Sequence, residues 1–251
     1  PMPARRVPRL AIRATVAAAF VVVLAPVLAL TAGSLRAQGG WSLAWWQSLG
    51  SVDAGTTRLG SPLSALTVSL TYALITAAVA AVIGGLAAVA VLAPGRARIV
   101  AILAMVPLGV SSATLGLGTL LAFGRPPVDL RATGLLVPMA HALVAVPLVV
   151  AVVAPALRST DGRRLAVAAT LGARPTRAFM TAYGSVLRVV VIASAGLAGA
   201  VSLGEFGAAA FLSRAGSPTV PVQIVRLLGR PGEQSFGVAA ALAVILVAVT
   251  L

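Results

Sequence analysis

Residues 165–175 read LAVAATLGARP and stand at the centre of a basic stretch, 158–188, that interrupts an otherwise apolar chain. Charge-free apolar runs flank this stretch on both sides. A helix needs about 20 apolar residues to cross a bilayer core, and the run before the stretch, 132–157, is long enough. A polar insert between two membrane spans therefore decides how the chain is organised.

The insert carries the signals of two helices joined by a sharp turn. Thr160 or Asp161 can cap the start of the first helix. Gly172 stands where a left-handed C-terminal cap is wanted, and Pro175 is placed to open the second helix. Taken alone, the pattern also fits an ordinary connecting loop whose arginines only set the membrane topology.

The composition indicates an all-α membrane protein. Of 251 residues, 59% are hydrophobic and only 10% are charged, and the mean hydropathy is +1.05. Soluble domains carry about a quarter of charged residues. No ten-residue alternating segments of a membrane barrel appear. We expect about six transmembrane helices, at 14–32, 63–92, 99–123, 135–157, 189–212 and from about 236.

Three segments call for a more specific expectation. The run 107–118 combines proline, glycines and hydroxyls, which predicts a bent or broken helix that serves either close packing or a pathway lining. Val220–Leu228 can form a short surface helix. The first run also has the shape of a signal peptide, but five more spans follow, so an uncleaved helix is preferred.

Three tryptophans, at 41, 45 and 46, lie in the polar loop 33–62. Tryptophan favours the membrane interface. The spacing of positions 41 and 45 predicts two rings on one helical face. They serve either as interfacial anchors or as a contact for an external partner.

The residue inventory excludes most hydrolytic and redox chemistry. All 19 basic residues are arginine, so there is no lysine for a phosphate-binding Walker motif or a Schiff base. There is no cysteine, and a single histidine excludes a two-histidine zinc motif. We therefore expect no enzyme, no cofactor and no metal site. If the protein performs a process that requires energy, another polypeptide must supply that energy.

The net charge of +14 reflects membrane topology rather than nucleic-acid binding, because the arginines sit in short loops. With the N-terminus inside, twelve arginines fall on the inner side and seven on the outer side. This bias predicts a cytoplasmic N-terminus and a cytoplasmic 158–188 loop. The inner arginines are at 5, 6, 9, 13, 96, 98, 158, 163, 164, 174, 177 and 188.

The loop resembles the coupling loop of permease subunits of type I ABC importers, whose fold is called MetI-like. Their motif is Glu-Ala-Ala, three further residues and a glycine. Gly172 takes the glycine position, so Ala166 stands where the family keeps its acid. The later Leu-Pro is replaced by Gly184 and Ser185, whereas the Leu-Gly-Ala-Arg-Pro core and Phe179 match. The resemblance implies an ATPase-coupling segment made of Ala166, Val167, Ala168, Ala169, Thr170, Leu171, Gly172, Ala173 and Arg174.

A second stretch of sequence indicates which group of these permeases the chain resembles. Residues 202–214, SLGEFGAAAFLSR, and 218–231, PTVPVQIVRLLGRP, look like the second half of fused iron(III) and thiamine permeases. The resemblance implies one transmembrane domain over 1–251, a piece of a longer two-half permease in a bacterial inner membrane. The implied partners are an ABC ATPase dimer, an extracytoplasmic solute-binding protein, a second permease half and the lipid bilayer.

Glu205 lies 17 residues past Arg188, or roughly 25 Å along a helix, which places it near the outer face of the membrane. It either reaches the interface or pairs with Arg214, or it is a pathway or gate residue, since intramembrane acids usually face a cavity. His141 is either a hydrogen-bonded interior residue or a ligand for solute. We predict a pathway and gate set made of Ser111, Ser112, Ser202, Glu205 and Phe206.

Two alternatives remain open. The missing acid at position 166 allows a weakly coupled or structural half of a permease. A membrane-embedded enzyme would need converging nucleophiles, acids or metal ligands. Five acidic residues and one histidine supply few of these.

Overall fold

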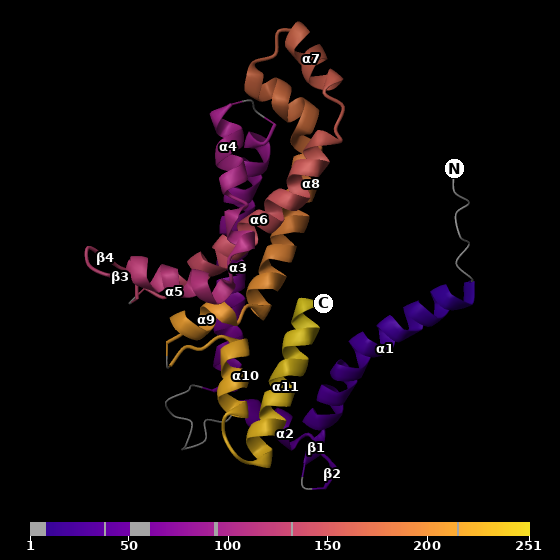
Figure 1. Cartoon of the computed structure of the whole chain (residues 1–251), viewed down its shortest axis with the longest axis vertical. Coiled ribbons are helices and arrows are strands. Elements are labelled where there is room, and N and C mark those ends of the chain that lie inside the picture. Colours follow the sequence, from indigo (N-terminus) through magenta and orange to yellow (C-terminus); the bar gives the residue numbers. More distant parts are fainter. Residues whose placement is uncertain (1–8, 38, 51–60, 93–94, 132, 215) are drawn as a thin grey trace.

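The computed structural model describes residues 9–37, 39–50, 61–92, 95–131, 133–214 and 216–251. Figure 1 shows the chain as a tall helical bundle, with two small hairpins as the only strands among the described residues. The elements are α1 (Arg9–Ser34), β1 (Arg36–Ala37), β2 (Gly40–Trp41), α2 (Ala44–Gln47), η1 (Ser48–Gly50), α3 (Pro62–Ala90), α4 (Arg96–Leu103), η2 (Val106–Gly109), α5 (Ser112–Phe123), β3 (Gly124–Arg125), β4 (Val128–Asp129), α6 (Leu136–Arg158), α7 (Arg163–Thr170), α8 (Pro175–Gly204), α9 (Gly207–Leu212), α10 (Val220–Leu228) and α11 (Glu233–Thr250).

The centre of the bundle is the helix triad α3, α6 and α8, which pack against one another more extensively than any other elements. Helix α6 is the innermost of the long helices, with 67% of its most apolar 18-residue segment buried. Its Val149, Val153 and Leu157 join Ala80 of α3 and Ala198 of α8 in one buried cluster. Small residues on α3 and α8 let these helices approach closely, as is common in membranes.

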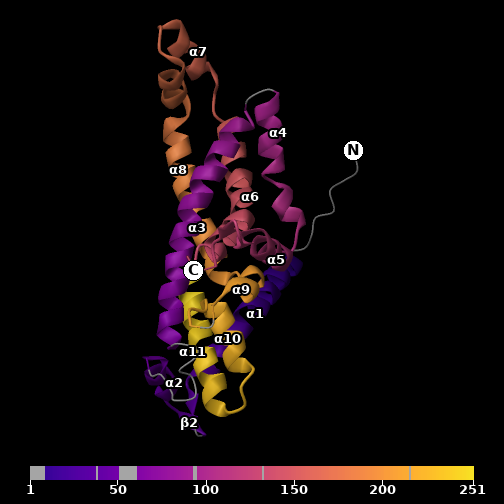
Figure 2. The ribbon, with the colours of Figure 1, turned by 90° about the vertical axis from the view of Figure 1, so that its left-hand side faces the viewer.

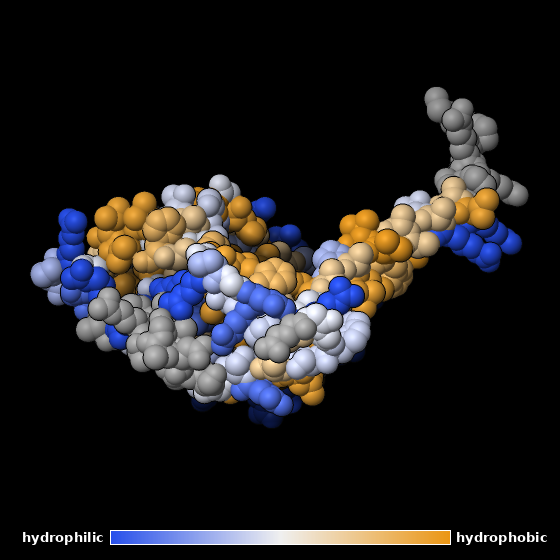
Figure 3. Space-filling model, turned by 90° about the horizontal axis from the view of Figure 1, so that it is seen from below, coloured by the Kyte–Doolittle hydropathy of each residue, from blue (hydrophilic) through white to orange (hydrophobic). Residues whose placement is uncertain are grey.

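Helix α1 contrasts with this core. It contacts α11, but no residue of its most apolar 18-residue segment is buried. Figures 1 and 3 show it reaching away from the bundle as a mostly apolar arm. Figure 3, which shows the molecule from below, has hydrophilic and hydrophobic residues interspersed on the bundle.

The structure confirms the predicted all-α architecture and the number of spans. In the part of the chain that the structure describes, five helices are long and apolar enough to cross a membrane, and a sixth span arises if the bent pair around α4 and α5 is counted as one. That pair, Ala101–Gly109 and Ser112–Phe123, bends by 113°. The predicted break in 107–118 is therefore confirmed, with Pro107 in the 3-10 turn η2 before it.

Two predicted boundaries are wrong. The fifth span was placed at 189–212, but α8 begins at Pro175 and ends at Gly204, and α9 follows a break. The first span starts at Arg9 rather than at 14. Arginine is a good helix former, so charge alone does not end a helix that the backbone can continue.

The predicted tryptophan face is also wrong. Trp41 lies in β2 and is 70% exposed, while Trp45 lies in α2 and is buried. The Trp45 indole donates a hydrogen bond to the Arg36 carbonyl at 2.5 Å. Helix α10 has the predicted bounds, but it is more than a surface helix, because Val220 and Leu227 pack in a cluster with α11 residues such as Leu242.

Candidate coupling helix and transmembrane break

Helix α7 lies at one end of the molecule, beyond the point where α6 and α8 separate (Figures 1 and 2). Gly162 occupies its N-cap position, so the prediction of Thr160 or Asp161 as the cap is wrong by one or two residues. Asp161 nevertheless accepts a hydrogen bond from the backbone N–H of Arg163 at 2.9 Å. Thr160 instead donates to the Ala156 carbonyl, at the end of α6.

The C-terminus of α7 has the predicted left-handed cap. Gly172 has a φ of 78°. The N–H of Gly172 donates to the Ala169 carbonyl and the N–H of Ala173 to the Ala168 carbonyl, each at 3.0 Å. These two bonds form a Schellman motif, which satisfies carbonyls that the helix end leaves free. Pro175 then opens α8, as predicted.

Most of the coupling segment faces outward. Only Ala168 is buried, on the side of α7 that packs on α8, and Ala173 is half-buried. The side chains of Leu171 and Val167 are 82% and 57% exposed, although both are large and apolar. Paired apolar side chains at the tip of an otherwise polar hairpin are a feature of surfaces that meet a partner.

The base of this hairpin is built from aromatic and small residues. The rings of Phe179 and Tyr183 lie 5.0 Å apart between centroids, on consecutive turns of α8. Ala178 and Ala182 of the same helix are buried. This packing holds the first turns of α8 against the segment that carries α7.

The second candidate region is the break between α8 and α9. Glu205 is in an extended conformation just after α8, and Phe206 precedes α9. The Glu205 carboxylate accepts a hydrogen bond from the N–H of Ala208 at 3.3 Å. A carboxylate at a helix start offsets the positive end of the helix, so Glu205 stabilises the new direction of the chain.

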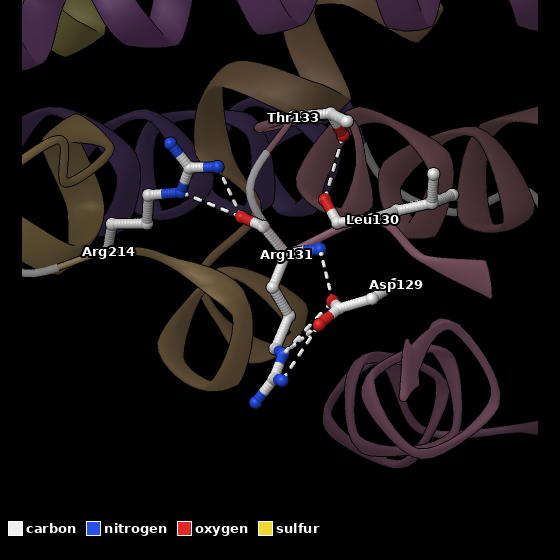
Figure 4. A network of polar contacts seen from close by, with 5 residues as sticks. All are labelled: Asp129, Leu130, Arg131, Thr133 and Arg214. Carbon is white, nitrogen blue, oxygen red and sulfur yellow. Dashed lines mark hydrogen bonds and ion pairs between the residues drawn. The ribbon is translucent and has the colours of Figure 1, made fainter. Parts of the chain in front are cut away.

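Glu205 does not pair with Arg214, which was one of its two predicted roles. Arg214 donates from Nε and from a terminal nitrogen to the Arg131 carbonyl (Figure 4). Arg131 in turn forms an ion pair with Asp129 at 2.8 Å. These bonds tie the loop after β4 to the segment after α9.

The start of α5 lies directly beside the break. A Cβ on Gly207 would overlap the Ser112 hydroxyl and would stand 3.3 Å from Glu205 Oε1. The structure thus brings Ser112 and Glu205 together around Gly207. Phe206, at 40% exposure, follows Glu205, and Ser111 is exposed at the N-cap of α5.

Ser202 lies apart from this surface, in a buried hydrogen-bonded chain. Its hydroxyl is 2.8 Å from His141 Nδ1 and donates to Thr76 Oγ1 at 3.3 Å. The interior interpretation of His141 is therefore confirmed. Sequence reasoning missed Thr76, because a threonine inside an apolar helix often bonds its own backbone and gives no sign of a partner on another helix.

Within the described ranges, no group of three or more histidine, aspartate or glutamate side chains comes close enough to hold a metal ion. The Ser202 hydroxyl does lie beside the His141 imidazole, but both side chains are buried, with at most 4% exposure, so this pair has no open access to a substrate. The polar groups of this region fix helix ends and connect helices.

The chain matches no protein-family model. It is 31% identical over 145 residues to the putative 2-aminoethylphosphonate transport system permease protein PhnV of Salmonella paratyphi A, across 58% of this chain and 54% of that protein. It thus spans about half the length of that relative. It is 29% identical over 221 residues to the putrescine transport system permease protein PotI of Escherichia coli K12, across 82% of this chain and 75% of that protein. Both relatives carry the names of transport permeases, in agreement with a non-catalytic transport subunit.

Proposed function

We propose that this chain is the transmembrane permease of an ATP-driven ABC importer and forms the translocation pathway for a small solute. The observation that carries the proposal is α7, a capped helix at the tip of the α6–α8 hairpin with Leu171 and Val167 exposed. Such a helix is suited to insert into a cleft of a partner. The similarity of the protein to two transport permeases supports the same function.

The partners follow from this role. An ABC ATPase dimer binds at α7, and a solute-binding protein delivers cargo at the opposite end of the bundle. A second permease half, fused or separate, completes the pathway in the inner membrane. The arginine distribution supports a cytoplasmic N-terminus.

The solute is proposed to contain a cationic group. The sequence resemblance points to iron(III) or thiamine, whereas the two relatives are named for 2-aminoethylphosphonate and putrescine. All four present a cationic centre. The half-buried Glu205 can offer such a solute a carboxylate, and an acid in a membrane span is costly unless it has a function.

Of the predicted pathway and gate set, Ser111, Ser112, Glu205 and Phe206 stay proposed as pathway residues, whereas Ser202, its fifth member, is buried on α8 beside the break. Replacement of Glu205 by glutamine keeps the hydrogen bond to Ala208 possible and removes only the charge. We expect Glu205→Gln to insert normally and to transport less. Normal uptake by this variant would exclude a gate role for the charge.

Crosslinking tests the ATPase contact. The chain has no cysteine, so a single introduced one is unambiguous. Thr170→Cys, on the exposed face of α7, should crosslink to a co-expressed ABC ATPase. Ala168→Cys is the matched control, because position 168 is buried against α8 and should crosslink poorly. An intact complex without a crosslink at position 170 would contradict the docking role of α7.

A second function, a weakly coupled permease half, is favoured by Ala166, which is exposed and stands where related permeases keep an acid. In that case Ala166→Glu should raise the crosslinking yield from Thr170→Cys. An unchanged yield would show that the acid is dispensable in this chain.

A further inference from the structure

A buried chain of hydrogen bonds connects three helices near the end of α8. Ser202 of α8 donates to Thr76 of α3 and lies within hydrogen-bond distance of His141 of α6. Thr76 donates in turn to the Pro138 carbonyl of α6 at 3.4 Å. Each of the three side chains is at most 4% exposed. We call Thr76, His141 and Ser202 the hydroxyl–imidazole chain.

The number of available protons fixes the direction of these bonds. Thr76 uses its single hydroxyl hydrogen on the Pro138 carbonyl, so it can only accept from Ser202. Ser202 thereby uses its own hydrogen and must accept from His141, whose Nδ1 therefore carries the ring proton. Every bond depends on the next one, and the loss of any hydroxyl interrupts the link from α8 to α3 and α6.

The break at Glu205 comes three residues after Ser202, within one helical turn of the hydroxyl–imidazole chain. The Ser202 carbonyl accepts the N–H of Glu205 at 3.4 Å, at the C-cap of α8. A Cβ on Gly204 would meet no described atom within 4 Å, so packing at that position does not hold the backbone. On the far side of the break, Gly207 is fixed against Ser112. The position of Glu205 is thus set from both sides.

We propose that Ser202, Thr76 and His141 are positioning residues that hold the end of α8, and with it the Glu205 break, against α3 and α6. Their importance for transport rests on the proposed permease function. They do not touch the solute in this role. Instead they limit how far the segment with Glu205 and Phe206 can open.

A single-cysteine experiment tests the proposal on the full chain in membrane vesicles without an ATPase. Phe206→Cys provides the reporter, and its reaction with a charged, water-soluble thiol reagent measures how often the break opens. Ser202→Ala and Thr76→Val should each raise the labelling rate about five-fold, as expected for the loss of one buried hydrogen bond. Thr76→Ser keeps the hydroxyl and should leave the rate unchanged.

Ser194→Ala is the matched control. Ser194 is also buried on α8, but its hydroxyl donates only to the Val191 carbonyl of its own helix, at 3.0 Å. Because its hydroxyl bond stays within α8, Ser194→Ala should leave the labelling of position 206 unchanged. The contrast with Ser202→Ala separates positioning of the break from a general contribution to stability.

The histidine provides a rescue test. His141→Asn keeps a donor at the position of Nδ1 and should retain the parental labelling rate, whereas His141→Leu should raise it. Equal rates in Ser202→Ala, Thr76→Val and the parent would overturn the proposal, and so would an equal rise in Ser194→Ala. Neither result would bear on the permease function, which is tested separately by the crosslink at position 170.

Discussion

Gly84 of α3 lies so close to Val149 of α6 that a Cβ on the glycine would stand 2.7 Å from the Val149 Cβ. The adjacent Gly85 is different, because a Cβ there would meet Val191 of α8 at 3.5 Å, an ordinary contact. The two neighbouring glycines therefore have different roles. Gly84 allows α3 to approach α6 closely, while a side chain at position 85 would make only ordinary contact with α8.

We expect Gly84→Ala to lower the free energy of unfolding by about 1–3 kcal/mol, because overpacking forces α3 and α6 apart. Gly85→Ala should be neutral or should raise it by up to about 1 kcal/mol, since alanine favours a helix. Reversible unfolding in mixed detergent micelles measures both. A similar loss in the two variants would contradict the close contact at position 84.

The cap of α7 gives a second prediction. Gly172 has a φ of 78°, and a Cβ there would meet no described atom within 4 Å, so only the backbone conformation resists substitution. The cost of this conformation for other residues is roughly 1–2 kcal/mol. Gly172→Ala should therefore speed hydrogen exchange of the α7 amides by roughly 5–30-fold.

Gly162, at the other end of α7, is the control for this experiment. Its φ of −66° is open to any residue, and a Cβ there would lie 3.8 Å from the Tyr183 hydroxyl. Gly162→Ala should leave the exchange rates near those of the parent. Faster exchange in Gly162→Ala alone would show that the N-terminal end, rather than the Schellman motif, limits the stability of α7.

The features that were predictable from the sequence are those with local causes. Gly172 and Pro175 mark helix ends through backbone conformations that few other residues favour. The break in 107–118 follows from Pro107 and its neighbouring glycines. Val220–Leu228 was bounded correctly because a proline lies at its start and a glycine follows its end.

What could not be predicted depends on contacts between distant residues. Thr76 and Ser202 are 126 positions apart, and nothing near either of them indicates a shared hydrogen bond. Trp45 is buried because Gly237 of α11 leaves room for its ring, a relation that no spacing within 33–62 reveals. Of the predicted gate set, Ser112 and Glu205 meet because α5 packs on α9.

The pair Asp129 and Arg131 gives a prediction about pH. The Arg131 side chain donates hydrogen bonds to the Asp129 carboxylate and holds the pKa of that carboxyl below its ordinary value. A lowered pKa in the folded state stabilises the fold above the ordinary pKa, and this contribution is lost as the pH falls through the lowered value. The contribution is small, because both groups are exposed.

Arg131→Gln should therefore raise the pKa of Asp129 towards its ordinary value. Carboxyl carbon shifts of 13C-labelled aspartate report this titration, and only three aspartates are present in the sequence, with Asp129→Asn as the assignment control. Arg125→Gln removes a charge on β3, at the position that pairs with Val128 next to Asp129, and should shift the titration less. An unchanged pKa in Arg131→Gln would show that the ion pair does not persist in solution.

The orientation of the chain can be tested with two single cysteines, in segments that the arginine count places on opposite sides of the membrane. Thr170→Cys lies on α7, and Val128→Cys lies on the β3–β4 hairpin, which reaches sideways from the bundle (Figure 1). Because twelve of the 19 arginines lie on the α7 side when the N-terminus is inside, we expect α7 in the cytoplasm. A membrane-impermeant thiol reagent should label position 128 in right-side-out vesicles and position 170 only in inverted ones. The reverse pattern would place α7 outside, where no ATPase could bind it, and would exclude both the orientation and the proposed coupling role together.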